Sequence, residues 1–166
     1  MPAQDFIYPE RLSGKVTTFA GNLHPGELER LADFIANPEG ELRYQVTAAL
    51  DARHRRVVSC RIVGFVFLMC QTTLESFRHE VAIDDRLVLV GSDQELPPIE
   101  EESDAEDFVV AAAPMDVRGL VEEAVILALP MIPRKPGLQQ APAVEPLGEA
   151  GKPSPFAALA GLKRPK

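Results

Sequence analysis

The chain has 166 residues, 46% of them hydrophobic, and a formal net charge of -8, which fits one domain with a tail or two very small domains. The acidic total excludes a broad phosphate-binding surface, although it leaves room for a local basic contact. No uninterrupted apolar run reaches the roughly 18 residues that cross a bilayer. The first residues, MPAQDFIYPE, lack the basic start and apolar core of a secretory signal. Two isolated thiols, Cys60 and Cys70, suit a reducing compartment, so we expect a cytoplasmic protein.

The first predicted element is an amphipathic helix over residues 24–36. Leu28, Leu31 and Phe34 recur there at three-residue spacing, with charged residues between them. Asn37 precedes a proline and therefore ends the helix, because the residue before a proline avoids the helical region.

Three strands with short connections follow. Residues 41–51 alternate cleanly between apolar and polar side chains, residues 57–70 form a longer apolar run, and residues 77–85 alternate again. Residues 86–90, RLVLV, extend the third strand. Connections this short join antiparallel strands, so the sequence predicts a β-meander rather than a parallel sheet.

The long middle strand has two different faces. We expect one face to belong to the core. The other carries Arg61 and then an apolar row, which needs cover from another element or a partner. Gly64 predicts a bulge or a close backbone approach. The expected core residues are Val58, Cys60, Ile62, Val66 and Leu68, and the apolar row is Val63, Phe65, Phe67 and Met69.

The next segment is strongly acidic. Residues 92–107 hold eight carboxylates and no lysine or arginine, which predicts a solvated loop because like charges repel. Residues 107–114 predict a short edge strand. Asp116 is a good N-cap for a buried helix over residues 117–129, and Pro130 ends it.

The C-terminal part separates into a linker and a tail. Residues 130–155 contain seven prolines without apolar periodicity, which predicts a flexible linker. We therefore expect one α+β domain over residues 1–133, an antiparallel β-meander packed by two amphipathic helices. A disordered Pro-rich linker over residues 134–152 and a short helical tail over residues 153–166 follow it.

No pattern of catalytic or metal-binding residues is present. Cys60 and Cys70 lie about 33 Å apart if both belong to one strand, at ~3.3 Å per residue, and neither belongs to a C-x-x-C pair. A nucleophile elbow and a phosphate-binding glycine loop are both missing. The sequence predicts no catalytic residue, no cofactor, no metal and no enzyme.

Two segments predict binding instead. The turn RHRR includes Arg53, Arg55 and Arg56, which are candidates for contact with RNA phosphates or an acidic partner; the alternative is a soluble turn. The tail begins with a helix start at Ser154 and Pro155. A helix this short needs a groove to become ordered, in its own domain or in a partner. The candidate partner-binding residues of the tail are Phe156, Leu159, Leu162, Lys163 and Arg164.

Three stretches resemble one bacterial family. DVRGLVEEAVILALPMIP and PSPFAALAGLKRPK are similar to the YceD family, and CQTTLESFRHEV is similar to the family's strand-turn-strand around a C-x-x-C. The resemblance runs from about residue 41 to the end, with a weaker trace of the N-terminal helix. Cys70 stands at the first cysteine of the motif, but Thr73 replaces the second. Where many relatives carry further cysteines, this chain has MIPRKPG, so a metal or thiol role does not carry over directly.

The resemblance implies a ribosome-biogenesis factor. The family is linked to accumulation of large-subunit (23S) ribosomal RNA. We expect a non-catalytic factor that supports synthesis, processing or stability of that RNA through an assembly or RNA-processing protein, with direct RNA contact open and no membrane or DNA. The alternative is an adaptor that recruits such a protein through its tail. A third hypothesis, a hydrolase or nuclease, would need carboxylates that converge in a deep pocket.

Overall fold

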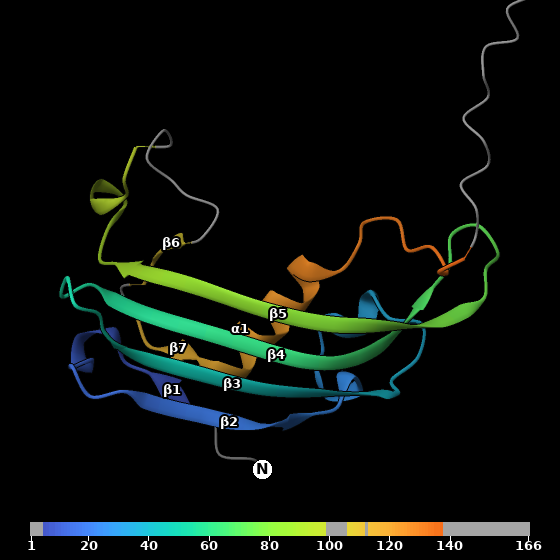
Figure 1. The fold of residues 1–166 in the computed structure, drawn as a ribbon, viewed down its shortest axis with the longest axis horizontal. Helices are drawn as coiled ribbons and strands as arrows, with labels where there is room; N and C mark the ends of the chain where they lie inside the picture. Colours follow the sequence, from blue (N-terminus) through green and yellow to red (C-terminus); the bar gives the residue numbers. More distant parts are fainter. Residues whose placement is uncertain (1–4, 99–105, 112, 138–166) are drawn as a thin grey trace, which may run out of the picture. The chain divides into compact units, whose positions relative to one another are not determined.

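The computed structural model describes residues 5–98, 106–111 and 113–137, and its centre is a five-stranded sheet (Figure 1). The strands lie in the order β2-β3-β4-β5-β6 and pair antiparallel, except that β6 runs parallel to β5. The described part also contains a two-stranded ribbon of β1 and β7, one α-helix, α1, and four 3-10 turns. The bounds are β1 Phe6–Ile7, β2 Thr17–Leu23, β3 Gly40–Leu50, β4 Arg56–Met69, β5 Ser76–Val90, β6 Asp107–Val110, β7 Met115–Asp116 and α1 Val117–Ala128.

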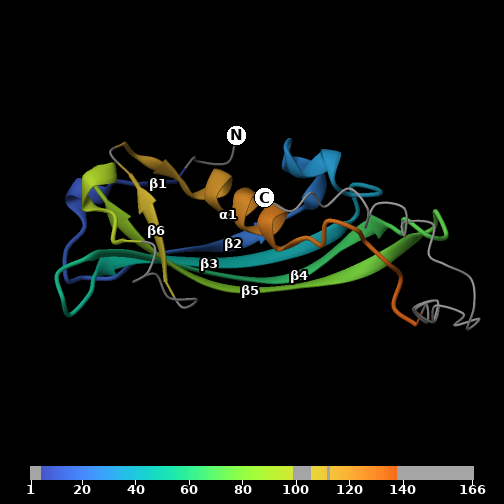
Figure 2. The same cartoon turned by 90° about the horizontal axis from the view of Figure 1, so that it is seen from above.

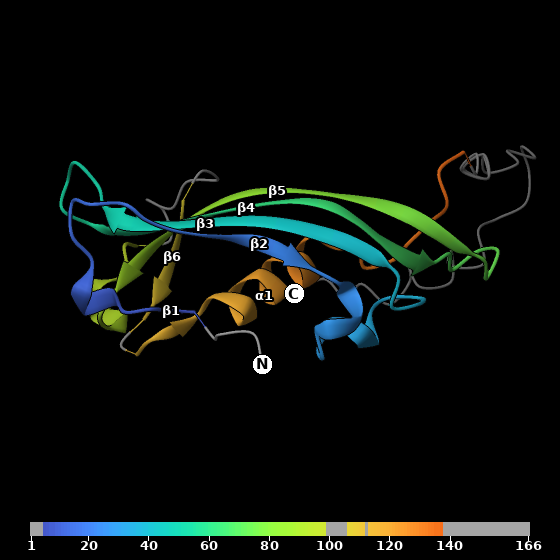
Figure 3. The ribbon, with the colours of Figure 1, turned by 90° about the horizontal axis from the view of Figure 1, so that it is seen from below.

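The helix and the β1–β7 ribbon lie on the same face of the sheet (Figure 2). Two 3-10 turns, Pro25–Glu27 and Leu31–Asp33, lie beside them, as the view from below also shows (Figure 3). The core forms between this layer and the sheet. Its fully buried side chains include all five core residues predicted on the middle strand: Val58, Cys60, Ile62, Val66 and Leu68.

The predicted meander and the buried helix are confirmed. The ends of the three central strands differ from their predicted positions by no more than one residue, and RLVLV continues β5 as expected. The Asp116 carboxylate accepts hydrogen bonds from the backbone N–H groups of Arg118 and Gly119, at 3.3 and 3.1 Å, which begins α1 as predicted. The fold class is therefore α+β.

The predicted helix over residues 24–36 is wrong. Leu28 and Leu31 are buried as its spacing required, but the segment forms two separate 3-10 turns. The Glu122 carboxylate of α1 accepts the backbone N–H groups of Arg30 and Leu31, at 2.7 and 3.1 Å. These tertiary hydrogen bonds replace helical ones, because each backbone N–H needs one partner and a buried carboxylate supplies it.

Two strands differ from the sequence-based expectation. β2, TTFAGNL, is an edge strand that the sequence did not predict because its small and polar residues give no alternation. β6 is the short edge strand expected near residue 107, but it pairs parallel to β5 and makes the sheet mixed. The tail and the linker beyond residue 137 lie outside the described residues, so the predictions made for them stay predictions.

Candidate binding surfaces

One face of the sheet is left open by the packed layer, and we call it the open face (Figure 2). Residues of β4 alternate between the core and this face, which brings the predicted apolar row to the surface. Val63 keeps 46% of its surface exposed and Met69 keeps 38%, while Phe65 and Phe67 are half-buried. No described helix or strand packs over the row, although the Arg78 side chain of β5 lies over the Phe65 ring. The row is therefore partly exposed on the open face, with Val63 and Met69 the most accessible of its side chains.

The two aromatic rings of the row are held in place. Phe65 and Phe67 meet edge to face, with ring centroids 5.9 Å apart. The Arg78 guanidinium lies 3.6 Å from the Phe65 ring centroid and also pairs with the Glu80 carboxylate at 2.6 Å. A cation over an aromatic face is attracted by the ring quadrupole, so these contacts hold the Phe65 ring in a defined orientation.

The charges of the open face occur in pairs. Arg61 lies 2.6 Å from Asp84 across β4 and β5, and Arg43 lies 3.7 Å from Glu41 on β3. Each pair is well exposed and therefore contributes little to stability. Their charges cancel, so the face combines an apolar row with a neutral polar surround. Such a surface suits a protein partner better than a polyphosphate chain.

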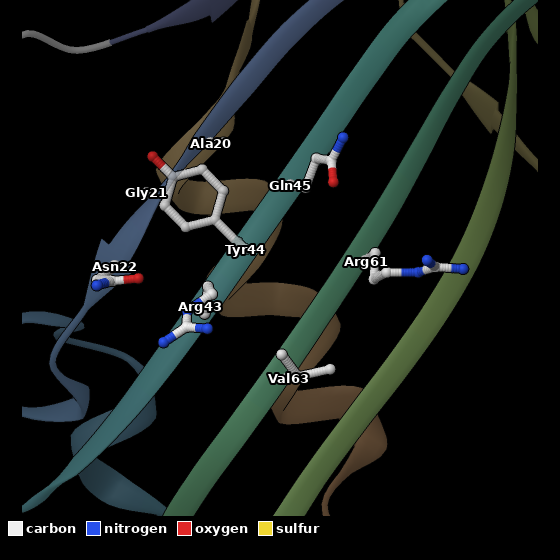
Figure 4. A pocket seen from close by; sticks show the side chains of 8 residues that line it. All are labelled: Ala20, Gly21, Asn22, Arg43, Tyr44, Gln45, Arg61 and Val63. Atoms are coloured by element: carbon white, nitrogen blue, oxygen red, sulfur yellow. The ribbon is translucent and has the colours of Figure 1, made fainter.

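A shallow depression of about 420 Å³ lies beside the apolar row. Arg43, Gln45, Arg61 and Val63 point from β3 and β4 at its margin, with α1 behind the strands (Figure 4). Gly21 leaves room at the edge strand, where an added Cβ would lie 3.0 Å from the Tyr44 hydroxyl oxygen. The depression has no carboxylate among its lining residues, so it differs from the deep acidic pocket that the enzyme hypothesis required.

The basic turn contributes one arginine to an ion-pair network. Arg53 is exposed and Arg56 is half-buried, whereas Arg55 pairs with Asp51 and with Glu106, at 2.8 and 2.9 Å. Glu106 belongs to the acidic stretch, so Arg55 contacts an acidic segment of its own chain. The sequence could not identify this pair, because its members lie 51 positions apart. The candidate tail residues, Phe156 to Arg164, lie outside the described residues.

The turn after β4 holds Cys70 in a hydrogen-bonded environment. The backbone N–H of Lys135 donates to the Cys70 Sγ at 3.4 Å. Hydrogen bonds from the Thr73 side chain first, and then from backbone N–H groups, outweigh burial and lower the pKa of Cys70 to about 6. Thr73, at the position of the missing second cysteine, is the largest contributor to this lowered pKa. Burial raises the pKa of Cys60 to about 11, so that thiol stays protonated.

The Cys70 thiolate is expected to make folding stability pH-dependent. Its pKa is about 6 in the folded chain against 9.0 ordinarily, so its stabilisation is complete above pH 9 and is lost as the pH falls through 6. The urea midpoint of the wild type should therefore exceed that of Cys70→Ser by more at pH 9 than at pH 5. A difference that stays constant between these pH values would contradict a folded-state thiolate.

Within the described ranges, no group of three or more His, Cys, Asp or Glu side chains is placed to hold a metal ion. None of the helices described is long and apolar enough to span a membrane.

The fold and these surfaces define an α+β domain whose helix and β1–β7 ribbon pack on one face of the sheet, while no described helix or strand packs on the other. The family model described as "Large ribosomal RNA subunit accumulation protein YceD" matches residues 58–163, so the chain belongs to the YceD family. A protein of that name from Haemophilus influenzae is 29% identical over 156 residues, which cover 88% of this chain and 87% of the relative. The comparison with solved structures found no match. The sequence-based recognition of the family is thereby confirmed.

Proposed function

We propose that this protein is a non-catalytic factor that supports the accumulation of large-subunit ribosomal RNA. The family description and the name of the similar Haemophilus influenzae protein support this choice. The match covers nearly all of β4, the whole of β5 and α1, so it includes the strand that carries the apolar row and the helix that packs behind it. The protein acts in the cytoplasm by binding an assembly or RNA-processing protein.

The open face is the observation on which this proposal rests. An apolar row with two oriented aromatic rings, set among cancelling charges, fits the centre of a protein interface. The adaptor hypothesis is compatible with this proposal. The open face then contacts one protein, and the tail with Phe156, Leu159 and Leu162 recruits a second one.

The test places a charge in the apolar row. Val63→Glu should leave the domain folded, since Val63 is 46% exposed, but it should weaken partner binding about tenfold or more because it buries an unpaired charge. In cells that lack the gene, this variant should restore less mature large-subunit RNA than the wild type. Leu127→Glu is the matched control, because Leu127 is 78% exposed on the outside of α1, and it should restore the RNA fully.

Deletion of residues 153–166 forms a second arm of the same experiment. If the tail recruits a partner, the truncated protein stays folded and also fails to restore the RNA. Full restoration by both the Val63→Glu variant and the truncated protein would overturn the proposed binding role.

A further inference from the structure

Two arginines at one end of the sheet hold a single carboxylate between them. Arg55 donates from Nη1 to Oε2 of Glu106 at 2.9 Å and from Nη2 to Oε1 at 3.0 Å. Arg86 donates from Nε to Oε1 at 2.9 Å. Arg55 comes from the β3–β4 hairpin and Arg86 from β5, and Glu106 immediately precedes β6. Figure 1 shows the hairpin and β6 at the same end of the sheet.

This arrangement has the geometry with which arginines bind a phosphate group. A guanidinium fork makes two parallel hydrogen bonds to a carboxylate or to a phosphate, and a second guanidinium adds charge from the side. The fork is already oriented, because the Asp51 carboxylate accepts Arg55 Nε–H at 2.8 Å. Asp51 also accepts the backbone N–H groups of Arg53 and Arg55, each at 2.9 Å, which fixes the hairpin.

The site can be reached from solvent. The side chains of Arg55 and Arg86 are 27% and 41% exposed, and that of Glu106 is 24% exposed. The two arginines are neutralised by Asp51 and Glu106 as long as Glu106 is in place. Without the Glu106 charge the cluster would carry one net positive charge, and the exposed Arg53 on the same hairpin would add another.

The residue that fills the site belongs to the most acidic part of the chain. Glu106 lies within residues 92–107, which hold eight carboxylates without a lysine or arginine. The side-chain hydrogen bonds from Arg55 and then Arg86 keep the pKa of Glu106 below its ordinary value. It is therefore ionised at neutral pH and competes with any other anion for the two guanidinium groups.

We propose that Arg55 and Arg86 form a phosphate-binding site for single-stranded RNA, and that Glu106 occupies this site until RNA displaces it. Glu106 is then a built-in competitor that occupies a local basic site in an acidic protein. The choice of RNA rests on the proposed function, whereas the phosphate chemistry rests on the geometry alone. The sequence predicted that the basic turn contacts either RNA phosphates or an acidic partner. In this proposal both use the same site, with Glu106 as the acidic partner that RNA displaces.

The test removes the competing charge and keeps the shape. Glu106→Gln should bind a fluorescently labelled single-stranded oligouridine about tenfold more tightly than the wild type. The slope of log K against log salt should become steeper by about 0.7 for each additional phosphate that the protein neutralises on a single strand. Glu75→Gln is the control. It changes the net charge equally at the opposite end of the sheet, where Glu75 pairs with Lys135 at 3.1 Å, and it should leave both values unchanged.

Additional variants tie the tighter binding to the two arginines. Arg55→Gln and Arg86→Gln, each added to Glu106→Gln, should return RNA affinity to the wild-type value, and thermal melting should show that all variants remain folded. Equal RNA binding by the Glu106→Gln and Glu75→Gln proteins would overturn the proposal. So would binding of inorganic phosphate by the Glu106→Gln protein without tighter binding of RNA, which would indicate a simple anion site. Because these measurements use purified protein, their failure would leave the Val63→Glu test of RNA accumulation in cells standing.

Discussion

Replacing Gly64 with alanine is expected to destabilise the domain by more than about 3 kcal/mol, because an added side chain would overlap the neighbouring strand. A Cβ at Gly64 would overlap the carbonyl oxygen of Glu41 and lie 2.9 Å from its carbonyl carbon and 3.0 Å from the Leu42 Cα. These atoms are backbone, so they can give way only if the β3–β4 ladder moves. The φ angle of +156° at Gly64 adds strain for any other residue.

The same ladder contains a second close approach. A Cβ at Gly40 would lie 2.5 Å from the carbonyl oxygen of Phe65. Gly40 of β3 and Gly64 of β4 therefore each allow the backbone of the neighbouring strand to approach closely. Urea denaturation of Gly64→Ala should show a large fall in midpoint. Gly14→Ala makes the same chemical change where no atom lies within 4 Å, and it should stay within about 0.5 kcal/mol of the wild type. Equal stability of the two variants would show that the strands separate easily.

The sequence was informative wherever local pattern and burial agree. Alternation in the middle strand predicted its core residues and also the apolar row on the opposite face. The strong helical period after Asp116, with a polar N-cap, predicted α1. Gly64 inside a strand predicted a close backbone approach, which the structure confirms. In each case the residues of one segment were enough to predict its secondary structure or its packing, without knowledge of distant residues.

The predictions fail where the local structure depends on contacts with residues far away in the sequence. Residues 24–36 have helical spacing, but their backbone N–H groups find a carboxylate 92 positions away. β2 becomes a strand because β3 offers a ladder to pair with, and its own residues carry no signal for it. The cluster of Arg55, Arg86 and Glu106 joins a hairpin, a strand and the end of the acidic stretch. Its arginines and carboxylates are visible in the sequence, but their meeting depends on the parallel pairing of β5 and β6.

Glu122→Ala is expected to lower the stability of the domain by about 3 kcal/mol, since it leaves buried backbone donors without a partner. Glu122 is 8% exposed, and its Oε1 accepts the N–H groups of both Arg30 and Leu31, while Oε2 lies 3.2 Å from the Arg30 Nε. This side chain therefore attaches the second 3-10 turn, Leu31–Asp33, to α1, while Arg118 of α1 donates to the Glu27 carbonyl oxygen of the first turn. Without it, Leu31 and Leu28 lose the anchor that holds them in the core.

Because Glu122 is charged, its contribution to folding stability is expected to depend on pH. Burial opposes ionisation, but the hydrogen bonds from Leu31 and Arg30 outweigh it and lower the pKa of Glu122 below its ordinary 4.5. Its stabilisation is therefore present above pH 4.5 and is lost as the pH falls through the lower folded-state pKa. Glu122→Gln keeps an oxygen for the two N–H groups, so its stability should lie between that of Glu122→Ala and the wild type.

The neighbouring carboxylate supplies the control for position and charge. Glu123 has a side chain that is 61% exposed, and it pairs with Arg30 at 3.5 Å in solvent, where such pairs contribute little. Glu123→Ala should change the free energy of unfolding by no more than about 0.5 kcal/mol. If Glu122→Ala were equally mild, the hydrogen bonds from Arg30 and Leu31 to Glu122 would contribute little to holding the Leu31–Asp33 turn. The hydrogen bonds that replace the predicted helix would then be a consequence of packing rather than its cause.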